Sequence, residues 1–160
     1  MSLLLNGSKT ITIAGTVMQC IEIYTGEAYT FPFSFTDTIG DPINISSWTL
    51  GVNAKYYDCT TTYPANSTTT IDIQDLVELN PQPSQPAGLA VGKTGGGTTG
   101  LGYIFVPTTL TGGPLPNPIL TVADTTTTLV IVTMSVSRTD AISSSTDVSR
   151  EPIGIIVRYQ

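Results

Sequence analysis

Residues 29–35 read Tyr-Thr-Phe-Pro-Phe-Ser-Phe, and residues 48–56 read Trp-Thr-Leu-Gly-Val-Asn-Ala-Lys-Tyr. Successive side chains of a β-strand point to opposite faces, so each run places its large apolar side chains on one face. The stretch Ile39-Gly40-Asp41-Pro42 between the runs is typical of a turn, because glycine tolerates a positive φ and proline restricts φ. Two half-buried strands joined in this way predict an antiparallel sheet with one side facing solvent.

The rest of the chain repeats this pattern and predicts an all-β domain. We expect further strands at residues 17–24, 101–106, 127–137 and 152–159. The run 127–137 is apolar on both faces and is expected to be a central strand. The pattern of residues 71–79 fits either a strand or a helical turn. Polar or Gly/Pro-rich loops are expected at residues 58–70, 80–100 and 111–118, and a hairpin-like excursion at 138–151. About seven strands predict a single two-sheet, immunoglobulin-like β-sandwich over residues 17–160, with long Gly/Pro-rich loops.

Residues 1–16 are expected to form an N-terminal arm outside this sandwich. We predict that its apolar side chains bind a partner, which would bury them and pair their strand edges: Leu3, Leu4, Leu5, Ile11 and Ile13. The alternative is that the arm folds back as an edge strand of its own domain. The loop at residues 80–100 is a second expected assembly surface, because ordering it costs backbone entropy that a neighbour can offset.

The composition excludes several kinds of partner. Charged residues make up 11% of the 160 residues, against roughly a quarter in average proteins, and the net charge is −6. The few basic residues form no patch, so a nucleic-acid partner is not expected. No apolar run reaches the roughly 18 residues of a membrane span, and the N-terminus lacks the basic start of a signal peptide. We therefore expect synthesis in a cytoplasm, no membrane partner, and apolar surface covered in an assembly.

Residues for catalysis or metal binding are scarce. The chain has no His, and its two cysteines, Cys20 and Cys59, are expected to be buried thiols, with a disulfide as the alternative. The stretch Gly88–Thr94 resembles a phosphate-binding loop but has the wrong spacing, and Gly95–Gly97 oppose a following helix. The carboxylates at 72, 75 and 78 lack the spacing of a calcium loop. We expect no enzyme activity, no cofactor, no metal and no small-molecule substrate.

Four further residues have two readings each. Pro32 cannot donate a ladder hydrogen bond, so its strand is expected at an edge or bulged. Trp48 is expected in the core, although a sugar-binding platform is the alternative. Arg150 and Arg158 are expected to face solvent on an edge strand, with a buried ion pair or a partner contact as the alternative.

The stretch Gly26-Glu27-Ala28-Tyr29-Thr30-Phe31-Pro32-Phe33-Ser34-Phe35 and the turn Gly40-Asp41-Pro42-Ile43-Asn44-Ile45-Ser46-Ser47-Trp48 resemble a known family. They look like the N-terminal immunoglobulin-like domains of tailed-phage baseplate and tail-fibre proteins. The ending Arg150-Glu151-Pro152-Ile153-Gly154-Ile155-Ile156-Val157-Arg158-Tyr159 is similar to the last strand of such domains. The resemblance covers about residues 20–60 and 125–160. Ser47 stands where the family often has Gly, and the middle of the chain departs from the family pattern.

This resemblance implies a structural protein of a tailed-bacteriophage virion, assembled in the host bacterial cytoplasm. Such a domain acts as a tail, baseplate or collar adaptor, or attaches a fibre, through contacts with other virion proteins and with copies of itself. A capsid cement or decoration protein is the first alternative. A carbohydrate-binding module that recognises a host surface is the second.

Overall fold

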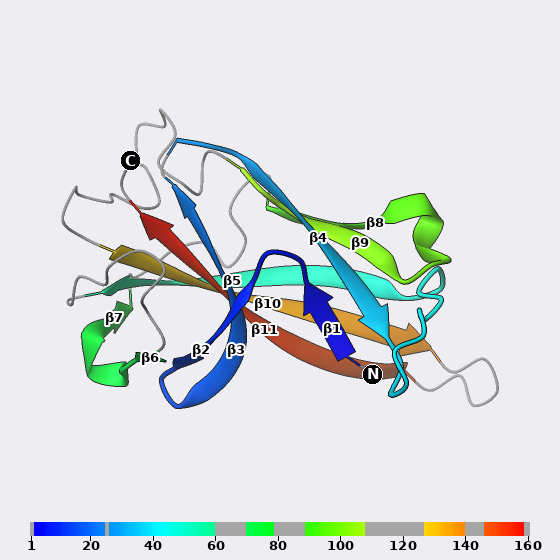
Figure 1. The fold of residues 1–160 in the computed structure, drawn as a ribbon, viewed down its shortest axis with the longest axis horizontal. Coiled ribbons are helices and arrows are strands. Elements are labelled where there is room, and N and C mark those ends of the chain that lie inside the picture. Colours follow the sequence, from blue (N-terminus) through cyan, green and yellow to red (C-terminus); the bar gives the residue numbers. More distant parts are fainter. Residues whose placement is uncertain are drawn as a thin grey trace.

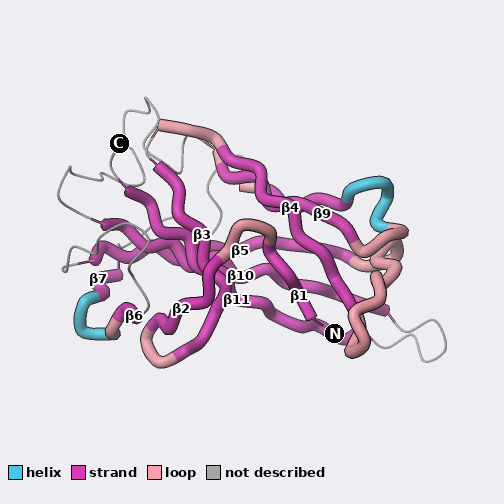
Figure 2. The backbone as a smooth tube through the Cα atoms, in the orientation of Figure 1, coloured by secondary structure: helices cyan, strands magenta, loops and turns pink. Residues whose placement is uncertain are grey.

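The computed structural model describes residues 2–24, 26–59, 70–78, 89–107, 127–139 and 146–158. These residues form two β-sheets that pack face to face, with short 3-10 turns and, within the described residues, no α-helix (Figures 1 and 2). The predicted all-β, two-sheet sandwich is therefore confirmed. Predicted loop residues 60–69, 80–88, 111–118 and 140–145 lie outside the described part.

The two sheets differ in size. The small sheet has four strands, in the order β1 (Ser2–Leu5), β4 (Tyr29–Thr36), β9 (Leu101–Val106) and β8 (Ala90–Lys93). The large sheet has seven, in the order β6 (Thr70–Ile71), β2 (Lys9–Ile13), β3 (Thr16–Tyr24), β11 (Thr146–Arg158), β10 (Thr127–Thr139), β5 (Thr49–Cys59) and β7 (Leu76–Glu78). Its neighbours are antiparallel, except that β11 pairs with β3 and β2 with β6 in parallel.

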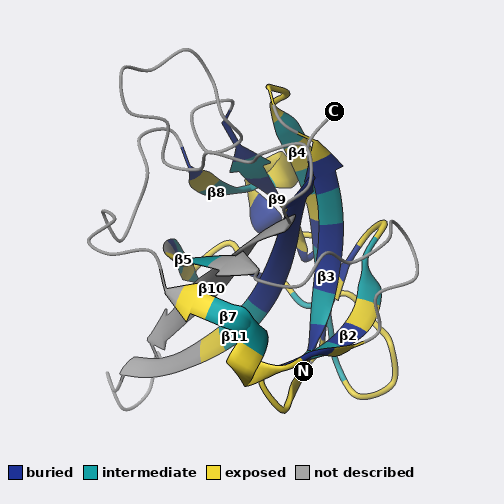
Figure 3. Ribbon diagram, turned by 90° about the vertical axis from the view of Figure 1, so that its left-hand side faces the viewer, coloured by how far each residue is buried: buried dark blue, intermediate teal, exposed yellow. Residues whose placement is uncertain are grey.

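The main core lies between the two sheets and follows the period of two that the sequence predicts. Phe33 and Phe35 of β4 are 1% and 0% exposed and face Ile21 and Ile23 of β3, which are equally buried. Along β3, Ile21 and Ile23 belong to the main core and Met18 and Cys20 to a second cluster on the opposite face, so most residues in the middle of the strand are buried (Figure 3). Trp48 is half-buried, and its ring meets that of Phe35 edge-on at 5.3 Å between centroids. Trp48 thus packs against the main core, as predicted, although its side chain remains partly exposed.

Pro32 lies in β4, an inner strand of the small sheet, at a position beyond the end of the neighbouring strand β1. The ladder between β1 and β4 covers residues 33–36, and the Asn6 N–H donates to the Pro32 carbonyl oxygen at 3.0 Å just past that ladder. The N and O of a strand residue point to the same side, so the missing N–H of Pro32 faces the side where β1 has ended. The predicted position at a sheet edge therefore holds only for the half of β4 that contains Pro32, because β1 does not extend along it.

The segment that the sequence assigned to an irregular loop at residues 80–100 contains regular structure, which corrects that expectation. Residues 90–93 form β8, which pairs with β9, and residues 94–97 form the 3-10 turn η2 (Thr94–Gly97). Glycines make this turn possible: at Gly100 φ is +72°, and a Cβ would lie 2.6 Å from the carbonyl oxygen of Phe35. The Phe35 N–H donates to Gly100, and the Ile45 N–H donates to Gly97.

The large sheet is curled, because a short link joins its two edge strands. Residues 72–75, including η1 (Ile73–Asp75), connect β6 to β7. The backbone from Ile71 to Leu76 spans at most about 18 Å, whereas the outer strands of a flat seven-stranded sheet lie about 29 Å apart. Figure 1 shows η1 connecting β6 to β7 near one end of β5. Residues 71–79, which the sequence left open, thus form two short strands and a 3-10 turn.

A second core fills the inside of this curl. Its buried members come from four strands and contact partly buried side chains of β5 and β7: Ile11, Ile13, Met18, Cys20, Ile71 and Ile156, with Tyr57 and Leu76. Gly154 lets the curl close, because a Cβ there would lie 2.9 Å from Cδ1 of Ile13 and 3.2 Å from the Cys20 sulfur. Cys20 is free and fully buried, and burial raises the pKa of its thiol to about 12. The side chain of Cys59 lies outside the described part.

The last two strands are longer than the sequence predicts. Strand β10 runs to Thr139 and β11 begins at Thr146, so much of the predicted excursion at 138–151 belongs to a hairpin of two paired strands. The central position of β10, between β11 and β5, is confirmed. Pro152 of β11 is paired with Thr133 of β10, and the pairing of β11 with β3 begins one residue later, at Ile153.

We expect Ile71→Ala to destabilise the protein by about 2–5 kcal/mol, because Ile71 is 0% exposed and truncation would leave a cavity in the second core. Ile73→Ala is the matched control, because Ile73 is 71% exposed on the same link and its truncation should change stability by less than about 0.5 kcal/mol. Urea unfolding of both variants measures the difference. Equal losses would contradict a curl closed by β6.

Candidate interaction surfaces

Four of the five predicted partner-binding residues are covered by their own chain. Leu3 and Leu5 are 8% and 4% exposed in the main core, and Ile11 and Ile13 are each 1% exposed in the second core. Leu4 alone faces outward, at 51% exposure. The expected free arm at residues 1–16 is therefore corrected: its two strands cross from the small sheet to the large one, much as in the fold-back alternative. The physical reason is that Phe33 and Phe35, the register partners of Leu5 and Leu3, already provide apolar surface beside them.

The outer edge of β1 is closed by a side chain from the other sheet. The Leu5 N–H donates to Gln19 Oε1 at 2.7 Å, and Gln19 Nε2 donates to the Leu3 carbonyl oxygen at 2.6 Å. The amide of Gln19 thus satisfies the outward backbone N–H and carbonyl groups of β1, as a neighbouring strand would. Ser8 adds to the network, because its hydroxyl donates to the Leu5 carbonyl oxygen at 2.7 Å. Pairing of β1 with a foreign strand would have to displace this amide.

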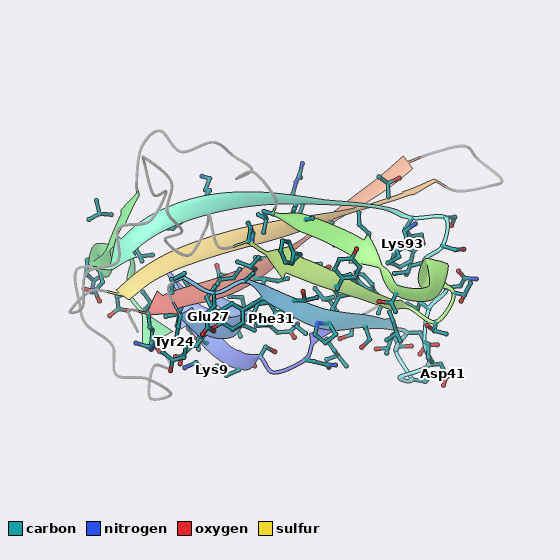
Figure 4. The ribbon with its side chains drawn as sticks, turned by 90° about the horizontal axis from the view of Figure 1, so that it is seen from above. Lys9, Tyr24, Glu27, Phe31, Asp41 and Lys93 are labelled. Atoms are coloured by element: carbon teal, nitrogen blue, oxygen red, sulfur yellow. The ribbon has the colours of Figure 1, made fainter. Side chains whose placement is uncertain are left out.

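A charged cluster lies at one end of the second core. Oε1 of Glu22 in β3 accepts hydrogen bonds from Lys9 Nζ of β2 at 2.6 Å and from Arg158 Nη2 of β11 at 2.8 Å. Strands β2 and β11 flank β3 on opposite sides, so Glu22 links three strands. The side chains of Glu22 and Arg158 are 13% and 10% exposed, and that of Lys9 is 30% exposed. Figure 4 places Lys9 near Tyr24, far from Lys93.

The electrostatics of the cluster favour an ionised Glu22. Burial alone would raise the pKa of its carboxyl group, but the hydrogen bonds and charges of Arg158 and Lys9 outweigh burial and hold that pKa below its ordinary value. The expectation that Arg158 faces solvent on an edge is wrong, because β11 is a central strand and Arg158 is 8% exposed. The buried ion pair, kept as the alternative, is what the structure has. Arg150 is exposed, as expected.

The outward side of the small sheet carries no charged side chain. Its members follow from the strand register, and we call this set the small-sheet outer face: Ser2, Leu4, Thr30, Pro32, Ser34, Thr36, Ala90, Gly92, Leu101, Tyr103 and Phe105. Leu4 and Leu101 are 51% and 43% exposed and flank Ser34, their common register partner. Tyr103, at 38% exposure, lies over Gly92, where a Cβ would be 2.4 Å from the Tyr103 ring.

Other expected sites can be placed in part. Lys93, at the end of the stretch that resembles a phosphate-binding loop, donates from Nζ to the Ser46 carbonyl oxygen at 2.7 Å, and its neighbours form β8. Within the described residues, no group of three or more His, Cys, Asp or Glu could hold a metal ion. Nor does any helix in that part have the length and apolar character to cross a membrane.

Sequence reasoning missed Gln19 and Glu22. The alternation of β3 does place Gln19 with the inward Ile21 and Ile23, and a polar residue in such a position is a signal that it meets a specific partner. Which partner it meets depends on β1, and the sequence does not show that pairing.

Comparisons with known proteins add little. No family model matches the chain, and no curated protein matches it. Among solved structures, one similar chain is AggA, the major subunit of aggregative adherence fimbriae type I from Escherichia coli. It shares 12% sequence identity, and the match covers 98% of this chain and 96% of that chain, with a TM-score of 0.25. This similarity is too low to support an argument.

We expect Glu22→Gln to lower the free energy of unfolding by about 2–3 kcal/mol at pH 7, because two cations would remain close together without a carboxylate. Since the pKa of Glu22 is lowered by folding, its contribution is present above the unfolded pKa of about 4.3 and is lost as pH falls through the folded pKa. The wild type and the variant should therefore converge in acid. Asp72→Asn is the control, because Asp72 makes no capping hydrogen bond. A difference independent of pH would be the contrary result.

We expect Gln19→Leu to cost about 1–3 kcal/mol, because the Leu5 N–H and the Leu3 carbonyl would lose their partner. Hydrogen exchange of the Leu5 amide should speed up relative to amides in β9. Gln74→Leu serves as control, since Gln74 is exposed on η1. Unchanged exchange at Leu5 would show that Gln19 does not protect this edge.

Proposed function

We propose that this chain is a structural protein of a tailed-bacteriophage virion. In this role it is an adaptor or fibre-attachment component of the tail, baseplate or collar and acts through protein–protein contacts. The observation that carries the contact role is the small-sheet outer face, which is uncharged and exposes Leu4, Leu101 and Tyr103. Exposed apolar side chains gathered on one face are typical of surfaces that another protein covers.

The place in a virion rests on the resemblance of the aromatic strand and the turn that follows it. In the structure these residues belong to one packed unit: Ile43 N–H donates to the Phe35 carbonyl oxygen at 3.0 Å, and Trp48 N–H donates to the Ile45 carbonyl oxygen at 3.0 Å. A motif whose members contact one another supports a resemblance better than scattered matches do. Catalysis is not part of the proposal, because the sequence has no His and offers no candidate pair of nucleophile and base.

The test is to locate the protein in particles of the phage that encodes it. We expect the chain in purified particles by mass spectrometry, and labelled antibody at the tail in electron micrographs. Label over the capsid would favour the cement or decoration alternative. Absence from purified particles would contradict a virion role altogether.

A further inference from the structure

We infer that Asn6 is a site of spontaneous covalent modification in the folded protein. Attack by the Gly7 backbone nitrogen expels the side-chain amide of Asn6 and leaves an isoaspartyl or aspartyl residue in the turn between β1 and β2. The modification is a property of the chain itself and does not depend on the virion role proposed above.

The sequence singles out this asparagine. Asn6 is the one asparagine of the chain that a glycine follows, since the other five precede Ile, Ala, Ser or Pro. Glycine matters because any other side chain would crowd the attacking backbone nitrogen, and proline has no N–H at all.

The structure places the pair in an exposed β-turn that links the small sheet to the large one (Figure 1). The Ser8 N–H donates to the Leu5 carbonyl oxygen at 3.3 Å, and Gly7, the third residue of the turn, has a φ of +78°. This is the geometry of a type II turn. Asn6 and Gly7 are both exposed, and nothing lies within 4 Å of the position that a Cβ of Gly7 would take. Hydroxide and water therefore reach the reacting groups.

The hydrogen bonds of the turn leave the reacting peptide unit free to rotate. The Asn6 N–H donates to the Pro32 carbonyl oxygen at 3.0 Å, and the bond that closes the turn joins Ser8 to Leu5. Both bonds belong to the neighbouring peptide units. Within the described part of the chain, neither the Gly7 N–H nor the Asn6 side chain has a hydrogen-bond partner. The Gly7 nitrogen can therefore turn towards Cγ of Asn6 without breaking a hydrogen bond.

The reaction exchanges one ammonia for one water and involves no oxidation. Hydroxide takes the proton of the Gly7 N–H, and the nitrogen forms a bond to Cγ of Asn6. The bond from Cγ to the side-chain nitrogen breaks, and ammonia leaves with a proton from water. Water then opens the cyclic imide at one of its two carbonyl carbons. Opening at Cγ restores the original main chain with an aspartyl side chain, whereas opening at the backbone carbonyl carbon leaves a main chain that runs through Cβ and Cγ.

Asn44 is exposed as well and serves as a control within the same molecule. Its Oδ1 accepts a hydrogen bond from the Ser46 N–H at 3.0 Å. The nitrogen that would attack it belongs to Ile45, which is 0% exposed and donates to the Gly97 carbonyl oxygen at 2.9 Å. Exposure is thus shared by both asparagines, and a free neighbouring nitrogen is found only at Asn6 of the two.

The isoaspartyl product should weaken the turn where the chain passes from one core to the other. It lengthens the main chain by one atom between Leu5 in the main core and Ile11 in the second core. It also displaces Ser8, whose hydroxyl lies 3.2 Å from Gln19 Oε1 in the network that closes the edge of β1. We therefore expect a lower melting temperature and faster hydrogen exchange of the Leu5 amide.

Incubation of the full-length purified chain at mildly alkaline pH, in water labelled with a heavy oxygen isotope, tests the inference. Trypsin cleavage after Lys9 releases residues 1–9, in which Asn6 is the only side-chain amide. We expect this fragment to lose ammonia and gain labelled oxygen, faster as pH rises, and to become a substrate of isoaspartyl methyltransferase. Residues 10–55, which hold Asn44, should stay unlabelled over the same time. Asn6→Gln requires a larger ring, so it should lose the labelling of residues 1–9 and melt as the wild type does.

Labelling of residues 1–9 only after the chain is unfolded in urea would overturn the inference, because the folded turn would then protect Asn6. Equal labelling at Asn44 would overturn the argument from the free nitrogen. Anion exchange separates the modified chain, which carries one more negative charge than the original −6. Its isoaspartyl form should melt below the Asn6→Asp variant, which adds the same charge without lengthening the main chain. Equal melting temperatures would contradict the expected loosening of the turn.

Discussion

The short link between β6 and β7 is the constraint on which the large sheet depends. It joins the two ends of the strand order, so the sheet has to curl until its edges come within reach of the link, and the curl creates an inside that must be filled. Six strands, β7 among them, contribute to the second core there, and Gly154 gives Ile13 the room to reach across β11. Without the link, the same apolar side chains would form the exposed outer face of a flat sheet.

The N-terminal residues hold the two cores together. Strand β1 completes the main core, β2 completes the second, and the turn between them carries the chain from one sheet to the other. Gln19 and Glu22 lie on opposite faces of β3: the first satisfies the edge of β1, and the second links β2 to β11. Because side chains of β3 bond to β1, β2 and β11, this one strand fixes both the edge of the small sheet and one end of the curled large sheet.

The low charge of the chain and its extensive strand pairing together limit the kinds of surface that it presents to other molecules. The Gln19 amide satisfies backbone groups at the outer edge of β1. The charged side chains at the end of the second core, Lys9, Glu22 and Arg158, bond to one another. Within the described residues, the small-sheet outer face is one surface of uncharged side chains that remains open to other molecules. In the role proposed above, such a surface would offer shape and apolar area to another protein.

The sequence by itself determined the class of the fold, the inward face of β4, the turn before Trp48 and the central place of β10. These depend on side-chain alternation and turn chemistry, which are local. Only the tertiary structure decided that residues 2–13 belong to two cores, that residues 70–78 close the curl, that Arg158 pairs with Glu22, and which side chains share the small-sheet outer face. Each of these depends on which distant strands become neighbours, and a strand with one apolar face can pair with several partners until the whole sheet order is set.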